Sequence, residues 1–313
     1  MEISEKTYTN ARTVSEAMQV ALNSGGNFRF IAGGTDVMVN AFQGNDNTVH
    51  LIDINRLEEL KGIVQDEHYL RIGALTRLDQ LKHVDAVKRE FPILIEAAQA
   101  VGSPLIRRSA TLGGNVLCEN RCIYFNQSEW WRMAVGYCLK CSGDVCIATG
   151  GKKACFSEFA SDTAPALISL KAQLLLHEPG GERLVPLESI YSGDGIKPLL
   201  LPRTSLVKEI LLPRAQHFKS AFKKLRLRES LEFTSLTVAV SKDMQGAARL
   251  VLGGVDPKPV LLELQPGESR EDIIKTALKK GRAVDNDMFS RAYRRDMIRV
   301  YIHQCLNQID FQS

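Results

Sequence analysis

The sequence lacks any long hydrophobic run and any concentrated block of positive charge. No stretch approaches the roughly 18 apolar residues that a membrane-spanning helix needs, so we expect no membrane span. The first residues, MEISEKTYTNARTV, carry both charge signs and no apolar core of a secretory signal, so we expect a cytoplasmic protein. The net charge is only +4, and apolar residues interrupt the densest basic stretches, which argues against nucleic-acid binding.

The sequence also lacks the G-x-G-x-x-G and G-x-x-x-x-G-K-[ST] motifs, which disfavours a Rossmann or P-loop site. It has instead two Gly-Gly loops, at residues 32–36 (AGGTD) and 110–115 (ATLGGN). Successive glycines let backbone N–H groups converge on an anion, and Thr35 and Thr111 add hydroxyl groups. Both loops therefore suit a phosphate, and together they suit a pyrophosphate. The alternative is that both are ordinary tight turns.

Length and patterning predict two domains of the α+β class. After Pro213 we expect three strands at residues 220–227, 236–241 and 247–255, followed by two helices. The first of these helices has Ser269 as its N-cap, and the second covers residues 288–306 with Asp285 as a cap. Before Pro213, Thr13 and Glu16 form a capping box for the first helix. The other expected helices are 91–101 and 163–170, and the expected strands are 28–32, 51–54, 69–74, 173–177 and 206–212.

Histidine is absent from residues 116–160, where six of the seven cysteines lie. In a reducing compartment such a group indicates metal or redox chemistry before disulfides, which remain an alternative. Four thiolates suit a [4Fe–4S] cluster or a structural zinc, and spacing alone does not separate the two. Cys138 and Cys141 form a C-x-x-C pair, a common spacing in metal sites. Cys118 and Cys305 are expected to be buried residues without a metal.

Five motifs in order resemble the FAD-binding subunits of the xanthine dehydrogenase and carbon monoxide dehydrogenase family of molybdenum hydroxylases. They are AGGTD at 32–36, IRRSATLGGN at 106–115, SDTAPAL at 161–167, AFK at 221–223 and GGV at 253–255. The resemblance covers nearly the whole chain. It implies a two-lobed FAD-binding domain of the PCMH and CO-dehydrogenase-flavoprotein type at residues 1–213. Its lobes are about 1–56 and 57–213, and a smaller α+β domain with a three-stranded antiparallel sheet follows at 214–313.

The resemblance also implies which residues hold FAD. Residues around the first loop would hold the pyrophosphate, and the second loop would close over the dinucleotide. Asp162 would bind a sugar or ribityl hydroxyl, although it could instead cap the helix after it. Lys223 would lie near the flavin, although it could instead be a solvated strand residue. The implied set is Ile31, Ala32, Gly33, Gly34, Thr35, Asp36, Val37, Thr111, Gly114, Asn115, Asp162 and Lys223.

Residues at about 116–160 form an insertion relative to ordinary flavin subunits of the family. The insertion resembles the one that marks the flavoprotein (β) subunits of 4-hydroxybenzoyl-CoA reductases, which hold a [4Fe–4S] cluster. On that match the ligands are Cys122, Cys138, Cys146 and Cys155, with Cys141 as the competing ligand. The aromatic pairs Tyr124-Phe125 and Trp130-Trp131 are expected to pack the insertion onto the domain and shield the cluster from water.

The resemblance implies a subunit that converts between one-electron and two-electron carriers. A low-potential donor such as ferredoxin would reduce the cluster. Electrons would then cross FAD to a small [2Fe–2S] subunit and a large molybdenum-cofactor subunit, in a dimer of heterotrimers that dehydroxylates 4-hydroxybenzoyl-CoA. One alternative is another xanthine, aldehyde or aromatic hydroxylase that uses NAD or another acceptor. Others are a zinc-stabilised docking module and a disulfide-stabilised binding protein without cofactor.

Overall fold

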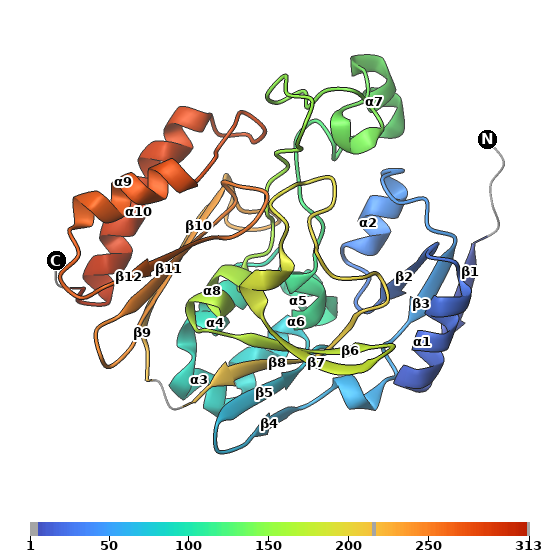
Figure 1. Cartoon of the computed structure of the whole chain (residues 1–313), viewed down its shortest axis with the longest axis horizontal. Coiled ribbons are helices and arrows are strands. Elements are labelled where there is room, and N and C mark those ends of the chain that lie inside the picture. The colour runs from blue at the N-terminus through green and yellow to red at the C-terminus, as the bar shows by residue number, and fades with distance from the viewer. Residues whose placement is uncertain (1–5, 215–216, 312–313) are drawn as a thin grey trace.

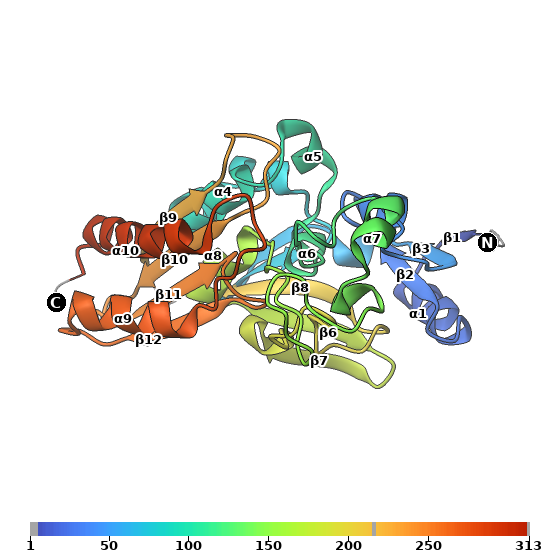
Figure 2. The ribbon, with the colours of Figure 1, turned by 90° about the horizontal axis from the view of Figure 1, so that it is seen from above.

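Three β-sheets form the framework of the protein (Figures 1 and 2). The structure is a computed structural model that describes residues 6–214 and 217–311. One sheet uses strands from residues 7–53, the second strands from 63–213, and the third strands from 219–264. No helix within the described residues is long and apolar enough to cross a membrane.

The first lobe is a small parallel sheet in the order β1–β3–β2. Helix α1 connects β1 to β2, which lie on either side of β3, and packs its apolar face onto the sheet. Helix α2 lies between the parallel neighbours β2 and β3 in sequence, as a crossover connection between parallel strands requires. Thr13 caps α1 as predicted, since its hydroxyl accepts from Glu16 N at 3.1 Å. The elements are β1 (Thr7–Asn10), α1 (Val14–Asn23), β2 (Phe28–Ile31), α2 (Val37–Phe42) and β3 (His50–Asp53).

The second lobe is an antiparallel sheet in the order β4–β5–β8–β6–β7, covered on one face by short helices. Its central strand, β8, comes last in sequence, so residues far apart in the chain close one core. The strands are β4 (Ile63–Gln65), β5 (Tyr69–Gly73), β6 (Gln173–Glu178), β7 (Gly181–Pro186) and β8 (Leu206–Pro213). The α-helices are α3 (Asp85–Glu90), α4 (Pro92–Gln99), α5 (Pro104–Ser109), α6 (Leu112–Val116) and α8 (Thr163–Ser169). The 3-10 helices here are Glu58–Leu60, Leu78–His83 and Leu187–Ile190.

The C-terminal part is an antiparallel sheet in the order β12–β11–β10–β9, with α9 and α10 packed on its outer face (Figure 2). Helix α8 of the second lobe covers the other face at β10 and β11, which are therefore buried on both sides. The elements are β9 (Lys219–Leu225), β10 (Leu236–Lys242), β11 (Ala248–Gly253), β12 (Val260–Leu264), α9 (Arg270–Lys280) and α10 (Arg291–Gln308).

Two predictions for this part need correction. The sheet has four strands, not three, since β12 is added at its edge. This strand was not predicted because it is short and follows Pro257 and Pro259, which indicate a loop. The cap of α10 is Ser290, whose hydroxyl accepts from Tyr293 N at 3.3 Å. The Asp285 carboxylate also stabilises the start of α10, since it accepts from Arg291 N at 2.8 Å. The predicted domain boundaries at 56/57 and 213/214 stay predictions.

The cysteine-rich insertion projects from the second lobe and contains α7 (Glu129–Val135) and a 3-10 turn (Leu139–Cys141) (Figure 1). Its base is closed by an antiparallel bridge between Arg121 and Glu158. Arg121 N donates to Glu158 O at 2.9 Å, and Glu158 N donates to Arg121 O at 2.6 Å. The insertion therefore leaves and rejoins the domain at one narrow neck.

Candidate cofactor sites

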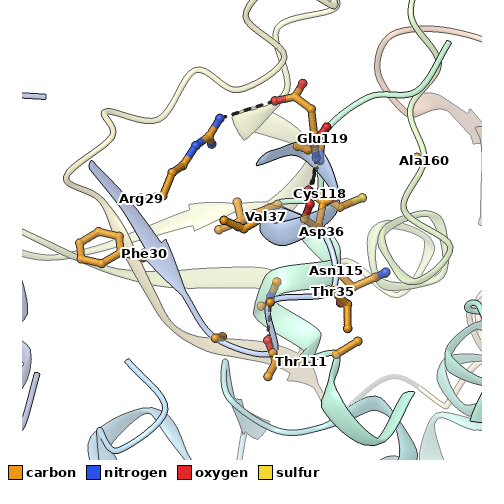
Figure 3. Close-up of a pocket in the computed structure, with 18 of the residues that line it drawn as sticks. Arg29, Phe30, Thr35, Asp36, Val37, Thr111, Asn115, Cys118, Glu119 and Ala160 are labelled. Carbon is orange, nitrogen blue, oxygen red and sulfur yellow. Dashed lines mark hydrogen bonds and ion pairs between the residues drawn. The ribbon is translucent and has the colours of Figure 1, made fainter. Parts of the chain in front are cut away.

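A cavity of about 590 Å³ lies where the first lobe meets the second (Figure 3). That volume suits a large organic cofactor. The loop after β2, the segment 110–115, Asp162 and the loop 196–203 all line it. Of the twelve predicted FAD-binding residues, ten line the cavity, namely Ala32, Gly33, Gly34, Thr35, Asp36, Val37, Thr111, Gly114, Asn115 and Asp162. Ile31 and Lys223 do not.

The first Gly-Gly loop offers a row of free backbone donors. The N–H groups of residues 33–37 donate to no acceptor within the described residues. Gly34 has φ +69, which favours glycine. Gly33 lies so close to α5 that a Cβ atom there would be 2.6 Å from the carbonyl carbon of Ser109. Ile31 supports the loop, with its side chain 3.5 Å from where a Gly34 Cβ would be. Such a row of N–H groups suits phosphate oxygens.

The second Gly-Gly segment, predicted as a loop, is helical: Leu112–Val116 forms α6, and Thr111 is its N-cap. Its backbone donors are therefore largely used within the fold. Leu112 N donates to Thr76 O at 2.8 Å, Gly113 N donates to Ala74 O at 2.9 Å, and Gly114 N donates to the Thr111 hydroxyl at 3.1 Å. This segment brings glycine backbone and side chains to the cavity, while the first loop brings the free N–H groups.

Asn115 is held in a fixed orientation at the cavity wall (Figure 3). Its Oδ1 accepts from the hydroxyl groups of Ser161 at 2.9 Å and Thr163 at 2.6 Å, and from Thr163 N at 3.2 Å. Since Oδ1 is committed to these partners, the Nδ2 donor is left for a bound group.

Asp162 carries a buried acceptor atom without a partner. Its Oδ2 pairs with Lys224 Nζ at 2.8 Å, but its buried Oδ1 has no hydrogen-bond partner within the described residues. Burial raises the pKa of Asp162, and the Lys224 ammonium opposes that shift. Asp162 stands at the N-cap position of α8 without a capping side-chain hydrogen bond, so the cap alternative is not realised. An unpartnered buried acceptor on a residue that lines the cavity fits a hydroxyl group of a dinucleotide.

Lys224 rather than Lys223 is the lysine that contacts Asp162, while the position of Lys223 near the flavin stays a prediction. Side chains alternate along β9, so Phe222 and Lys224 face the second lobe, whereas Ala221 and Leu225 join the core beneath α9 and α10. Lys223 shares the face of Ala221 and Leu225. Lys224 is buried and reaches Asp162, which Lys223 cannot do from the opposite face.

Arg121 is a cavity residue that sequence reasoning missed. Its guanidinium forms an ion pair with Asp36 and lies 4.7 Å from the centre of the Phe233 ring. Asp36 also accepts from Glu119 N at 3.1 Å. Asp36 therefore holds the first loop against the beginning of the insertion. No local motif marks Arg121, because its partner lies 85 residues away in the chain.

A second, small cavity lies inside the insertion and is lined by Cys122, Cys138, Cys146 and Cys155. Cys141, the competing ligand, does not line it. The neighbouring Cys141 side chain is the main cause that lowers the pKa of Cys138 to about 6. All seven cysteines are free, and no three His, Cys, Asp or Glu side chains in residues 6–214 and 217–311 are close enough to hold one metal ion.

The remaining predictions for the insertion have mixed outcomes. Tyr124 and Phe125 line the cysteine cavity, and their shielding of a cluster stays a prediction. Trp130 is 72% exposed and so does not pack the insertion onto the domain. Cys118 is half-buried and lines the larger cavity, as Figure 3 shows, while Cys305 is buried in the C-terminal core.

The cavity and its loops suit a dinucleotide cofactor. Residues 2–215 match the family described as "FAD binding domain in molybdopterin dehydrogenase", and the chain belongs to this family. It is an FAD-binding subunit of the molybdenum hydroxylase type, which confirms the predicted family and the predicted FAD domain.

Several proteins of similar sequence are named as FAD-binding subunits. Aldehyde oxidoreductase FAD-binding subunit PaoB of Escherichia coli K12 is 34% identical over 267 residues, which is 82% of this chain and 83% of that protein. The xanthine dehydrogenase FAD-binding subunit of Escherichia coli O157:H7 is 28% identical over 260 residues, 81% and 75% of the two chains. Among solved structures, carbon monoxide dehydrogenase from Hydrogenophaga pseudoflava has the same fold, with a TM-score of 0.77 at 21% identity over 97% of both chains.

Proposed function

We propose that this chain is an electron-transfer flavin subunit that carries a [4Fe–4S] cluster as well as FAD. The observation that carries the proposal is the cysteine cavity. Four cysteines from a window of 34 residues, Cys122 to Cys155, surround one space, and the adjacent Cys141 stands outside it. These four are the ligands implied by the resemblance to 4-hydroxybenzoyl-CoA reductase flavoproteins.

The proposed FAD site assigns one task to each group of residues. The N–H groups of residues 33–37 bind the pyrophosphate, Asn115 Nδ2 donates to the dinucleotide, and Asp162 Oδ1 accepts from a hydroxyl group. Bound FAD supplies two-electron chemistry, whereas an iron–sulfur cluster passes single electrons. The subunit would thus exchange electrons between one-electron and two-electron partners.

We infer a cluster rather than a structural zinc from the resemblance of the insertion. A structural zinc could use the same four thiolates as a [4Fe–4S] cluster, so analysis of iron, zinc and acid-labile sulfide separates the two.

We further propose that the complex reductively dehydroxylates 4-hydroxybenzoyl-CoA, with a ferredoxin-like donor, a [2Fe–2S] subunit and a molybdenum subunit as partners. The resemblance of the insertion supports this reaction. A second candidate is aldehyde oxidation, which is supported by the 34% identity to the aldehyde oxidoreductase subunit of Escherichia coli. The cytoplasmic location and the dimer of heterotrimers remain predictions.

Metal and flavin analysis of the anaerobically purified full chain tests the cofactor proposal. We expect about four irons and four acid-labile sulfides per chain, together with one FAD. Replacing Cys122, Cys138, Cys146 or Cys155 by Ser should abolish iron binding and leave FAD in place. Cys141→Ser is the matched control and should keep its iron. One zinc without iron, or loss of iron in Cys141→Ser but not in Cys138→Ser, would contradict the proposal.

The reaction is tested on the assembled complex. It should consume 4-hydroxybenzoyl-CoA with a reduced low-potential donor, and it should not oxidise aldehydes. The reverse result would favour the second candidate. The isolated chain should do neither, because the proposal places the substrate site on the large subunit.

A further inference from the structure

Lys140 is a buried lysine on the wall of the cysteine cavity. Its side chain is only 5% exposed. It lies in the 3-10 turn Leu139–Cys141, directly after Cys138, so the turn that places Cys138 at the cavity also directs Lys140 inward. Burying an ammonium group is costly unless partners compensate it.

Three partners compensate the Lys140 ammonium. Its Nζ pairs with Glu119 Oε1 at 2.7 Å and donates to Gly195 O at 2.5 Å. It also lies 5.0 Å from the centre of the Phe125 ring, within the range of a cation–π interaction. The charge is therefore fixed in place beside the four thiols.

One of these partners, Glu119, lines the flavin cavity. Another, Gly195, directly precedes residues 196–198, which line the same cavity. Gly195 also contacts Cys155, which lines the cysteine cavity. Gly195 N donates to Cys155 O at 2.9 Å, and a Cβ atom on Gly195 would be 2.8 Å from Cys155 Sγ. Lys140 and the loop 192–198 thus form the partition between the two cavities.

We propose that Lys140 is a positioning residue that raises the reduction potential of the cluster and holds the loop 192–198 between the cluster and the flavin. This inference rests on the proposed cluster. Reduction adds one negative charge to a cluster, so a fixed positive charge nearby stabilises the reduced form, and the effect is strong where water is excluded. Glu119 acts in the opposite direction while it anchors the lysine.

An anaerobic redox titration of the full chain in its complex, followed by electron paramagnetic resonance, tests the inference. Lys140→Gln should shift the midpoint of the cluster to a more negative potential, and Lys140→Arg should restore it. Glu119→Gln should shift the midpoint to a more positive potential, because it removes the carboxylate and leaves the ammonium. Lys152→Gln is the matched control, since Lys152 is exposed in the same insertion and water and salt screen its charge.

Iron and FAD contents separate this inference from the proposed function. A wild-type chain without iron would overturn both the cluster and the role of Lys140. A wild-type chain with its cluster, but with midpoints in Lys140→Gln and Glu119→Gln equal to that of Lys152→Gln, would overturn the role of Lys140 alone. If Lys140→Gln does not retain iron, Glu119→Gln tests the role of Lys140 instead. A more positive midpoint in Glu119→Gln would support that role, and an unchanged or more negative midpoint would contradict it.

Discussion

Lys223 and Lys224 are neighbours on β9 whose side chains face opposite sides of the sheet, which makes them a matched pair for mutation. Lys224 Nζ contacts Asp162 Oδ2 at 2.8 Å, Ala100 O at 2.9 Å and Glu232 O at 3.1 Å. Lys224→Met leaves the buried Asp162 carboxylate without its partner. We expect it to lower the free energy of unfolding by about 3–5 kcal/mol and to weaken FAD retention.

The control, Lys223→Met, should change the free energy of unfolding by less than about 1 kcal/mol and leave the FAD content unchanged. Urea denaturation and the ratio of flavin to protein measure both quantities. Equal effects of the two variants would contradict the assignment of Lys224 to the cofactor site.

Gly33 is a second residue on which the site depends, because its lack of a side chain lets the first loop lie close to α5. In Gly33→Ala the new methyl group would meet backbone atoms of Ser109 and Ala110, which cannot move as a side chain can. The loop with the free N–H groups should therefore shift away from α5. We expect FAD affinity to fall at least about tenfold, which corresponds to about 1.4 kcal/mol, measured by fluorescence titration of flavin-free protein.

Gly180→Ala is the control for this change, because a Cβ atom at Gly180 would meet no atom within 4 Å. It should bind FAD as the unmodified chain does. If Gly33→Ala also binds FAD normally, the first loop does not hold the cofactor in the way that we propose.

At the scale of elements, Glu178 on β6 forms hydrogen bonds that link the hairpin β6–β7 to Ser205, the residue directly before β8. It accepts twice from Arg183 at 2.8 Å and once from the Ser205 hydroxyl at 2.6 Å. The hydrogen bond from Arg183 is the main cause that lowers the pKa of Glu178 to about 2. Because the folded pKa is lower than the unfolded one, the stabilisation is present above the unfolded pKa of about 4.5 and is lost as the pH falls towards 2.

Glu178→Gln should therefore lower the free energy of unfolding at pH 7 by up to about 1 kcal/mol. The difference from the unmodified chain should shrink below about pH 4.5. Urea denaturation at a series of pH values measures it. Glu182→Gln is the control, since Glu182 makes a single ion pair with Lys208 and is more exposed. A difference that grows as the pH falls would contradict the role of Glu178.

Most elements could be predicted from the sequence, because hydrophobic periodicity and Gly or Pro residues mark them. Strand β12 was missed because it is short and follows two prolines. Other elements of three to seven residues were also not predicted, namely β1, β4, β7, α2, α3, α5, α6 and α7. Lys224 was missed because sequence does not fix the phase of a strand, and a shift of one residue exchanges its two faces. The two Gly-Gly loops carry local motifs, so their place at the cavity could be predicted.

The contacts of Arg121, Lys224 and Lys140 could not be predicted in the same way. Their acidic partners lie 85, 62 and 21 residues away, and only the fold brings each pair together. The free N–H groups of the first loop could be anticipated from two adjacent glycines. The internal hydrogen bonds of the second loop depend on Ala74 and Thr76 in another part of the lobe.

At the scale of the whole molecule, the insertion begins and ends at two residues that lie side by side. The two ends of the insertion are already joined by the paired hydrogen bonds between Arg121 and Glu158. An antiparallel pair of this kind can be closed by a two-residue turn such as Asn-Gly.

Replacing residues 122–157 by Asn-Gly should therefore give a folded, yellow protein that binds FAD and contains no iron. Its flavin absorbance should remain, and the broad absorbance of the cluster should be absent. Lys140 and Arg132 would no longer contact Gly195 and Gln43, so the free energy of unfolding should fall while cooperative unfolding persists. Absorbance spectra, iron analysis and urea denaturation measure these three outcomes, with the quadruple Cys→Ser variant at the four proposed ligands as the control. Loss of FAD in the shortened chain but not in the Cys→Ser variant would mean that the insertion is part of the flavin site, not a separate attachment to it.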